Sequence, residues 1–201
     1  MLILVGLNHR TAPVDVRERL SVSDAKLEET TLSLRSIEGV EGAAVLSTCN
    51  RVEAVVSTND EDVIAQIVEW MAQRANSVRT ELEKHLYVIR HGDVVKHLFR
   101  VASGLDSMIV GEPQIAGQFK KAFVAAQHLD ALDTLLLQLY ENTLRVAKKV
   151  RTDTGIGESA VSVPFCELAT NSRPLSVRLL TPARSSKFLS ILIDPNRSNS
   201  E

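Results

Sequence analysis

The chain has few of the features that mark specialised classes of protein. Among its 201 residues only Cys49 and Cys166 are cysteines, and neither lies in a CxxC pair, so we expect neither a zinc site nor a structural disulfide. No apolar run approaches the roughly 20 residues of a membrane span, and segment 2–5 is strand-like rather than a charged leader. We therefore expect a soluble protein of a reducing compartment, the cytoplasm, without membrane contact.

A strong charge of either sign is also lacking. The formal net charge is −2, and residues 171–201 carry five Lys or Arg against two Asp or Glu, so the remainder is acidic. Any contact with nucleic acid must therefore come from a local basic patch. One candidate lies within 145–151, at Arg145, Lys148, Lys149 and Arg151. The same cluster is also typical of a solvated helix end that the helix dipole favours.

Hydrophobic periodicity predicts an α+β fold in which a small mixed α/β sheet subdomain is followed by an antiparallel helical bundle. In the first part we predict strands over 2–7, 43–48, 52–58 and 86–89. Helices are predicted over 23–37 and 60–76. The second part is wholly helical, with predicted helices over 93–103, 113–128 and 132–152.

The last part of the chain, 170–201, has a different composition. Residues 171–201 contain seven serines, four arginines and three of the six prolines, and no glycine. No turn signal bounds its one apolar run, 188–193, so we expect an irregular, disordered tail.

One short segment carries the strongest chemical signal. Cys49 and Arg51 lie in 47–51 (STCNR), directly after the apolar run 43–46, where a strand is expected to end. Thiolate is the nucleophilic form of cysteine, and a neighbouring guanidinium favours it. Taken alone, however, Cys49 is more consistent with a small, inert buried side chain, because free cysteines are usually inside.

Three longer strings give this segment a context. They are 6–14 (GLNHRTAPV), 46–53 (LSTCNRVE) and 97–120 (HLFRVASGLDSMIVGEPQIAGQFK), with further support at 145–154 and 160–163. In this order they resemble the N-terminal catalytic domain of glutamyl-tRNA reductase over residues 1–169. The resemblance implies a catalytic domain with an α/β part at 1–90 and a helical part at 91–155.

The resemblance implies a covalent mechanism. In that family a cysteine attacks the ester carbonyl of glutamyl-tRNA, tRNA leaves, and NADPH reduces the thioester to glutamate-1-semialdehyde, which begins five-carbon tetrapyrrole (porphyrin and heme) biosynthesis. Cys49 would be this nucleophile. A thioester suits the chemistry because its carbonyl accepts hydride more readily than that of an ester.

Further site residues follow from the same resemblance. Arg51 is suited to hold the substrate's side-chain carboxylate, and Glu112 to accept from its α-ammonium group. His97 aligns with the family's active-site histidine, which polarises the carbonyl or handles a proton. Without the resemblance, His97 would be a half-buried structural residue and Glu112 a solvated loop residue. The other expected substrate contacts are Thr48, Asn50, Ser107, Pro113, Gln114 and Gln118.

The expected cofactor site is missing. Binding of NADPH usually needs a GxGxxG turn between a strand and a helix, and the last glycine of this chain is Gly157. Members of the family continue into a dinucleotide-binding domain and a dimerisation domain, form homodimers, and pass the product to glutamate-1-semialdehyde aminotransferase. We therefore expect a reductase that is truncated or frameshifted near Thr170, limited to forming and hydrolysing the thioester.

Two other interpretations stay open at this stage. The chain could be an inactive fragment that binds only tRNA or a partner protein. It could also be a cysteine hydrolase of small esters, with His97 as the base for the thiol.

Overall fold

Within the part of the chain that the structure describes, four strands form one antiparallel sheet. They are β1 (Leu2–Asn8), β2 (Val40–Ser47), β3 (Arg51–Thr58) and β4 (Tyr87–Arg90), in the order β2-β3-β1-β4. The coordinates are a computed structural model that describes residues 1–154 and 156. All four predicted strands are confirmed, with ends that shift by at most three residues.

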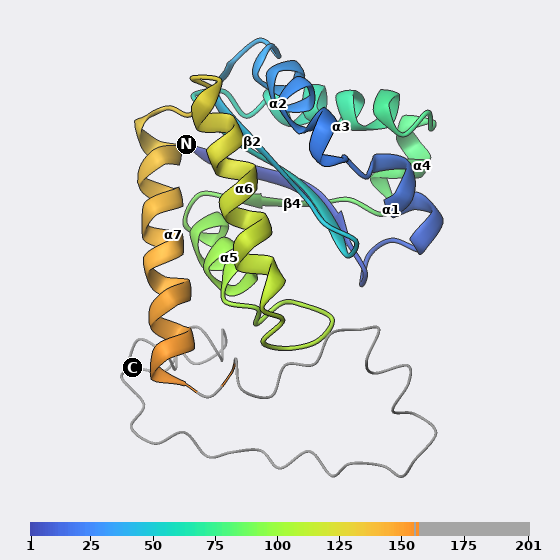
Figure 1. The fold of residues 1–201 in the computed structure, drawn as a ribbon. Coiled ribbons are helices and arrows are strands. Elements are labelled where there is room, and N and C mark those ends of the chain that lie inside the picture. The colour runs from blue at the N-terminus through green and yellow to red at the C-terminus, as the bar shows by residue number, and fades with distance from the viewer. Residues whose placement is uncertain (155, 157–201) are drawn as a thin grey trace, which may run out of the picture.

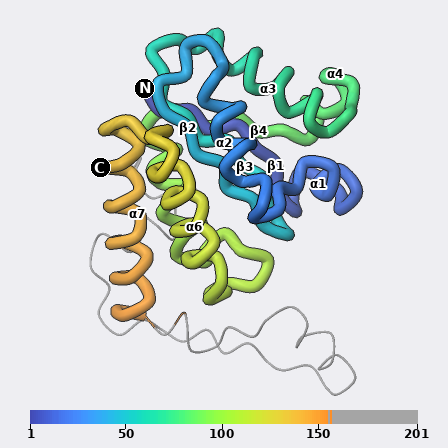
Figure 2. Tube along the Cα trace, turned by 45° about the horizontal axis from the view of Figure 1, so that its top comes forward, coloured from blue at the N-terminus to red at the C-terminus, as the bar shows by residue number. Residues whose placement is uncertain are grey.

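Helices cover both faces of this sheet, as Figure 1 shows. One face packs against α1 (Val14–Leu20), α2 (Leu27–Arg35), α3 (Val63–Arg74) and α4 (Arg79–Glu83). The other packs against α5 (Gly92–Ala102), α6 (Gln114–His128) and α7 (Thr134–Asp153). The three helices predicted as a bundle therefore contact one another and also lie on the sheet (Figure 2).

The alternation of side chains along β1 explains why both faces are buried. Ile3, Val5 and Leu7 belong to the core beneath α1–α4, whereas Leu2 and Leu4 belong to the core beneath α5–α7. Each of these side chains is at most 6% exposed, and burial of one stabilises the fold by roughly 2 kcal/mol.

The same alternation orients β3. Val52, Ala54 and Val56 pack beneath α1–α4, and Val55 lies on the opposite face. Arg51 and its neighbour two residues on, Glu53, therefore point toward α5–α7. A pair of opposite charges is thus buried at the start of β3, the strand that follows Cys49.

The helices differ from the sequence prediction chiefly at one predicted helix and at two helices that were not predicted. The expected helix over 23–37 is a 3₁₀ turn at Asp24–Lys26 followed by α2. Short helices α1 and α4 were not predicted, because seven and five residues leave too few turns for an apolar period to appear. Each buries one side chain, Leu20 in α1 and Leu82 in α4.

Two kinds of feature are absent from the described residues. None of their helices is long and apolar enough to span a membrane. Nor do these residues contain a cluster of three or more His, Cys, Asp or Glu side chains arranged to hold a metal ion. The expected disordered tail at 170–201 lies outside the described residues.

Candidate active site

Cys49 is exposed in the middle of the three-residue turn, 48–50, that joins β2 to β3. The Thr48 N–H donates to the Arg51 carbonyl at 2.9 Å, which closes the turn. The Thr48 side-chain oxygen accepts from the N–H groups of Asn50 and Arg51 at 3.1 and 3.2 Å. Thr48 thus fixes the backbone that presents the Cys49 thiol to solvent.

The Arg51 guanidinium, in contrast, points into the protein. Its side chain is 2% exposed, and Nη1 lies 2.9 Å from Oε1 of Glu53. Nη2 donates to the Asp106 carbonyl oxygen at 2.5 Å and to Asp106 Oδ2 at 3.1 Å. Burial by itself lowers the pKa of Arg51. The opposing effects, of which the charge of Glu53 is the largest, outweigh burial, and the pKa is raised. Arg51 therefore stays charged and bridges β3 to the loop after α5.

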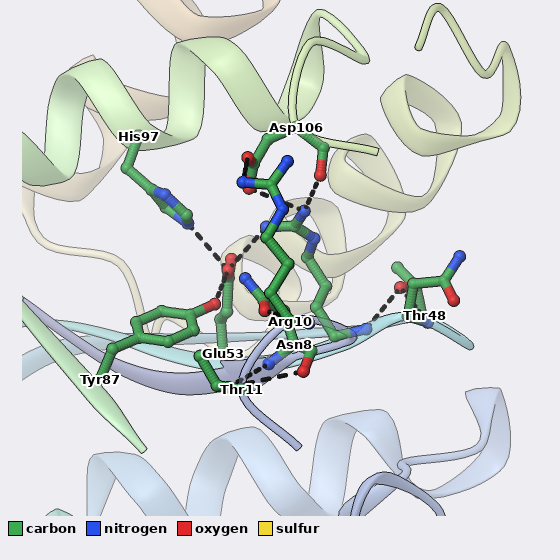
Figure 3. A network of polar contacts seen from close by, with 10 residues as sticks. Asn8, Arg10, Thr11, Thr48, Glu53, Tyr87, His97 and Asp106 are labelled. Carbon is green, nitrogen blue, oxygen red and sulfur yellow. Dashed lines mark hydrogen bonds and ion pairs between the residues drawn. The ribbon is translucent and has the colours of Figure 1, made fainter. Parts of the chain in front are cut away.

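Glu53 is the centre of this buried network, which Figure 3 shows. Its Oε1 accepts hydrogen bonds from the Arg51 guanidinium and, at 2.5 Å, from the Tyr87 hydroxyl. The same oxygen lies 2.8 Å from Nε2 of His97. Burial raises the pKa of this fully buried carboxyl, but the charges of His97 and Arg51 and the hydrogen bonds from His97 and Tyr87 outweigh it. The net result is a pKa of about 2.

The ionised Glu53 determines how His97 is oriented. Because the carboxylate can only accept, Nε2 of His97 carries the proton, and in the neutral ring Nδ1 is then the acceptor. The ring also contacts Tyr87 edge to face, with centroids 5.9 Å apart. Burial and then the charge of Glu53 raise the pKa of Tyr87, so its hydroxyl remains a neutral donor.

The loop between α5 and α6 supplies Asp106 and Ser107, both 7% exposed. Gly104 and Gly111 close this loop: the Gly111 N–H donates to the Gly104 carbonyl at 2.9 Å, and both have positive φ, 76° and 86°. A Cβ on Gly104 would lie 3.1 Å from Gly111 Cα. Glycine is therefore required for the close approach that holds Asp106 over Arg51.

The remaining predicted contacts lie where the loop enters α6. Glu112 is half-buried, and its carbonyl oxygen accepts from Nη2 of Arg151 at 3.0 Å, which joins α7 to the loop. Pro113 and Gln114 are exposed at the start of α6, and Gln118 is half-buried one turn further. The predicted residues thus form two groups, one around Arg51 and His97 and one at the start of α6.

Sequence reasoning missed four members of the site: Arg10, Glu53, Tyr87 and Asp106. Arg10 Nη1 lies 3.0 Å from Oδ1 of Asp106, and the other three surround Arg51 and His97 as described. Glu53 had a recognisable signal, because on a strand it shares a face with Arg51 two residues earlier. Tyr87 and Asp106 come from distant segments, and no local pattern connects them to Cys49.

His9, to which the sequence assigned no chemistry, connects the end of β1 to the Cys49 turn. Its backbone N–H donates to the Asn50 carbonyl at 2.9 Å. Burial, followed by the charges of Arg10 and Arg51, lowers the pKa of His9. Among the described residues, His9 Nδ1 and Glu53 Oε2 are buried atoms without a hydrogen-bond partner.

Comparison with known proteins points to one family. Residues 5–154 match the family model described as glutamyl-tRNA(Glu) reductase, N-terminal domain. A glutamyl-tRNA reductase of Marinobacter nauticus is 44% identical over 168 residues, which are 84% of this chain and 39% of that protein. One of Carboxydothermus hydrogenoformans is 46% identical over 165 residues, 82% of this chain and 37% of that protein.

A solved structure agrees with these sequence matches. Glutamyl-tRNA reductase from Methanopyrus kandleri superposes with a TM-score of 0.64 at 32% identity, covering 85% of this chain and 39% of the other. The chain therefore spans about two fifths of the length of the relatives it matches.

Proposed function

The chain belongs to the family of the glutamyl-tRNA reductase N-terminal domain, and we propose that it carries the acyl-transfer half of that reaction, with Cys49 as the nucleophile. The observation that supports this most directly is the placement of Cys49. Its thiol is exposed on a turn whose backbone Thr48 fixes, next to a buried network of Arg51, Glu53 and His97. An exposed thiol on a rigid turn is suited to attack a bulky ester.

The proposed reaction has two steps. In the first, Sγ of Cys49 bonds to the ester carbonyl carbon of glutamyl-tRNA, the bond to the tRNA ribose oxygen breaks, and the thiol proton ends on that oxygen. In the second, water attacks the thioester carbonyl, the C–S bond breaks, and a proton returns to sulfur while glutamate leaves. The first step, formation of the thioester, is common to this proposed reaction and to the reaction of the reductases.

His97 is proposed to handle the proton in these steps. Its Nε2–H is bound to Glu53, so Nδ1 is the ring atom left to exchange a proton with the reacting groups. Glu53 positions the ring for this role, because its carboxylate oxygen, 2.8 Å from Nε2, fixes which ring nitrogen points away from it.

Substrate contacts predicted from the sequence remain part of the proposal. Glu112 would accept from the α-ammonium group of the glutamyl residue, and Arg51 would attract its carboxylate. Because the Arg51 side chain is 2% exposed, direct contact requires Asp106 to move away from it. The other proposed contacts are Thr48, Asn50, Ser107, Pro113, Gln114 and Gln118.

Reduction by NADPH is not assigned to the described residues. A dinucleotide needs free backbone N–H groups around its pyrophosphate, but the glycine loop of this site bonds to itself, Gly111 N–H to Gly104 carbonyl. This loop does not fit the cofactor, and we assign none of the described residues to it.

Mass spectrometry tests the site and the chemistry together. The chain is incubated with glutamyl-tRNA, quenched in acid and digested, and a glutamyl adduct is expected on the Cys49 peptide. The Cys166 peptide is the internal control, since it reports non-specific acylation of thiols. In the Cys49→Ser variant the adduct on sulfur should disappear, and an undiminished adduct there would remove Cys49 from the mechanism.

The balance of products tests how far the reaction proceeds. We expect slow release of glutamate from glutamyl-tRNA and no oxidation of added NADPH. Both are followed in one assay, glutamate by an enzymatic end-point and NADPH by absorbance. Turnover of NADPH by the purified chain would show that it reaches the hydride step after all.

A further inference from the structure

Of the two arginines that contact Asp106, Arg10 is the one that a substrate can reach. Its side chain is 60% exposed, whereas that of Arg51 is 2% exposed. The Arg10 backbone is held by its N–H, which donates to Oδ1 of Asn8 at 2.9 Å in the turn after β1. An anion that approaches from solvent therefore meets Arg10 before it meets Arg51.

Arg10 is also close to the nucleophile in the fold. In the β1–β3 ladder Asn8 is paired with Arg51, and the next residue, His9, donates its N–H to the Asn50 carbonyl. The turn that carries Arg10 and the turn that carries Cys49 thus meet at one end of the sheet. Figure 3 shows the Arg10 side chain extending from this end of the sheet toward Asp106.

Asp106 holds the two arginines in different ways. Oδ1 lies 3.0 Å from Arg10 Nη1, and Oδ2 lies 3.1 Å from Arg51 Nη2. The contact with Arg51 is buried and reinforced by the Asp106 carbonyl oxygen, whereas the contact with Arg10 is at the surface. Because Asp106 Oδ2 stays paired with Arg51, a ligand can replace Asp106 on the 60% exposed Arg10 without leaving the buried carboxylate unpaired.

The guanidinium of Arg10 has N–H groups that its contact with Asp106 does not use. Arginine carries five N–H groups in a planar fork, and its contact with Asp106 uses Nη1. This fork matches a pair of anionic oxygens, which a carboxylate and a phosphodiester both present. Glutamyl-tRNA carries both groups near its ester.

We propose that Arg10 binds an anionic oxygen pair of the acyl donor, with Asp106 as the positioning residue that aims its guanidinium. The oxygen pair is either the glutamyl side-chain carboxylate or the phosphodiester at the 3′ end of the tRNA. This inference rests on the proposed function for the identity of the acyl donor, but its test is a binding measurement that needs no acyl transfer.

The test compares dissociation constants in a Cys49→Ala background, in which no thioester can form. Fluorescence anisotropy measures binding of one labelled tRNA charged with glutamate and, separately, with glutamine. Arg10→Gln should weaken binding of glutamyl-tRNA about tenfold or more, since a hydrogen-bonded charge contact contributes about 1.5–3 kcal/mol. The matched control is Arg19→Gln on α1, an arginine that is 54% exposed and lies 3.6 Å from Asp15, and it should leave binding unchanged.

The two charged tRNAs identify the oxygen pair. If Arg10 binds the carboxylate, Arg10→Gln abolishes the preference for glutamyl- over glutaminyl-tRNA. If Arg10 binds phosphate, Arg10→Gln weakens the binding of both tRNAs equally, and the slope of log affinity against log salt falls by about 0.7. In that case Arg10→Lys should restore much of the binding, whereas a carboxylate held by both fork nitrogens needs arginine.

Equal dissociation constants for the Arg10→Gln and parent proteins would overturn the inference, as would equal losses in Arg10→Gln and Arg19→Gln. Circular dichroism of each variant checks that the fold is retained. The proposed function fails separately: absence of a glutamyl adduct on Cys49, with binding that still depends on Arg10, would reject the thioester and keep the Arg10 contact.

Discussion

Gly6 lies opposite Glu53 in the β1–β3 ladder, and a Cβ at Gly6 would come within 2.8 Å of both Glu53 Cγ and the Val52 carbonyl oxygen. Gly6 is also paired with Tyr87 on its other side. Glu53, Gly6 and Tyr87 therefore form a row across three strands, and the missing side chain in the middle lets the Tyr87 hydroxyl reach Glu53 at 2.5 Å.

Gly6→Ala should therefore disturb the buried network. The added methyl group meets backbone as well as side-chain atoms, so we expect a loss of about 1–3 kcal/mol in the free energy of unfolding. Urea denaturation measures this loss. Gly117→Ala is the matched control, because no atom lies within 4 Å of its new Cβ and alanine favours the helix by up to about 1 kcal/mol. Equal stability of Gly6→Ala and the parent protein would contradict the close approach.

Tyr87→Phe should remove one donor from Glu53 without opening a cavity. We expect a loss of about 1.5–3 kcal/mol in unfolding free energy, because the hydroxyl donates to a charged, buried acceptor. Acylation of Cys49 should also slow if Glu53 orients His97. The measurements are urea denaturation and the rate of adduct formation by mass spectrometry.

Tyr140→Phe is the control for that variant. Tyr140 stacks on Phe123 of α6, with ring centroids 5.3 Å apart, and belongs to the core rather than to the Glu53 network. It should leave the acylation rate unchanged. If both tyrosine variants slow acylation by the same factor, the effect comes from general loosening of the core and not from Glu53.

Stability should fall in acid partly through Glu53. Its pKa is lowered from 4.5 to about 2 in the folded protein, so it contributes stability above pH 4.5 that is lost as pH decreases toward 2. In Glu53→Gln this contribution is absent at every pH. We therefore expect the stability difference between the parent protein and Glu53→Gln to shrink as pH falls below 4.5, measured by urea denaturation at several pH values. A difference that stays constant over this range would show that Glu53 does not titrate as proposed.

Thr48→Val should loosen the turn that presents Cys49. The variant keeps the shape of threonine but loses the oxygen that accepts from Asn50 and Arg51, at about 0.5–1.5 kcal/mol for each hydrogen bond. We expect slower acylation of Cys49 by glutamyl-tRNA. Thr48→Ser retains the hydroxyl and should acylate at nearly the parent rate, so a similar loss in both variants would argue against the role of the hydroxyl.

The amino-acid sequence by itself determined the order and type of most elements. Continuous apolar runs predicted β1 and β2, a weak alternation predicted β3, and the helical period over 132–152 predicted α7, because each pattern reflects how a regular element is buried. The strings around Cys49 and His97 also indicated the family, since their order along the chain is itself informative.

Only the tertiary structure decided what Arg51 contacts. From the sequence it was a free cation beside Cys49, but the pleat of β3 turns it away from the thiol and onto Glu53 and Asp106. Asp106 is 55 residues away along the chain, and local patterns contain no information about such a pairing. The exposure of Arg10 was hidden for the same reason: burial depends on which distant segments pack together, and that is settled only when the sheet and α5–α7 assemble.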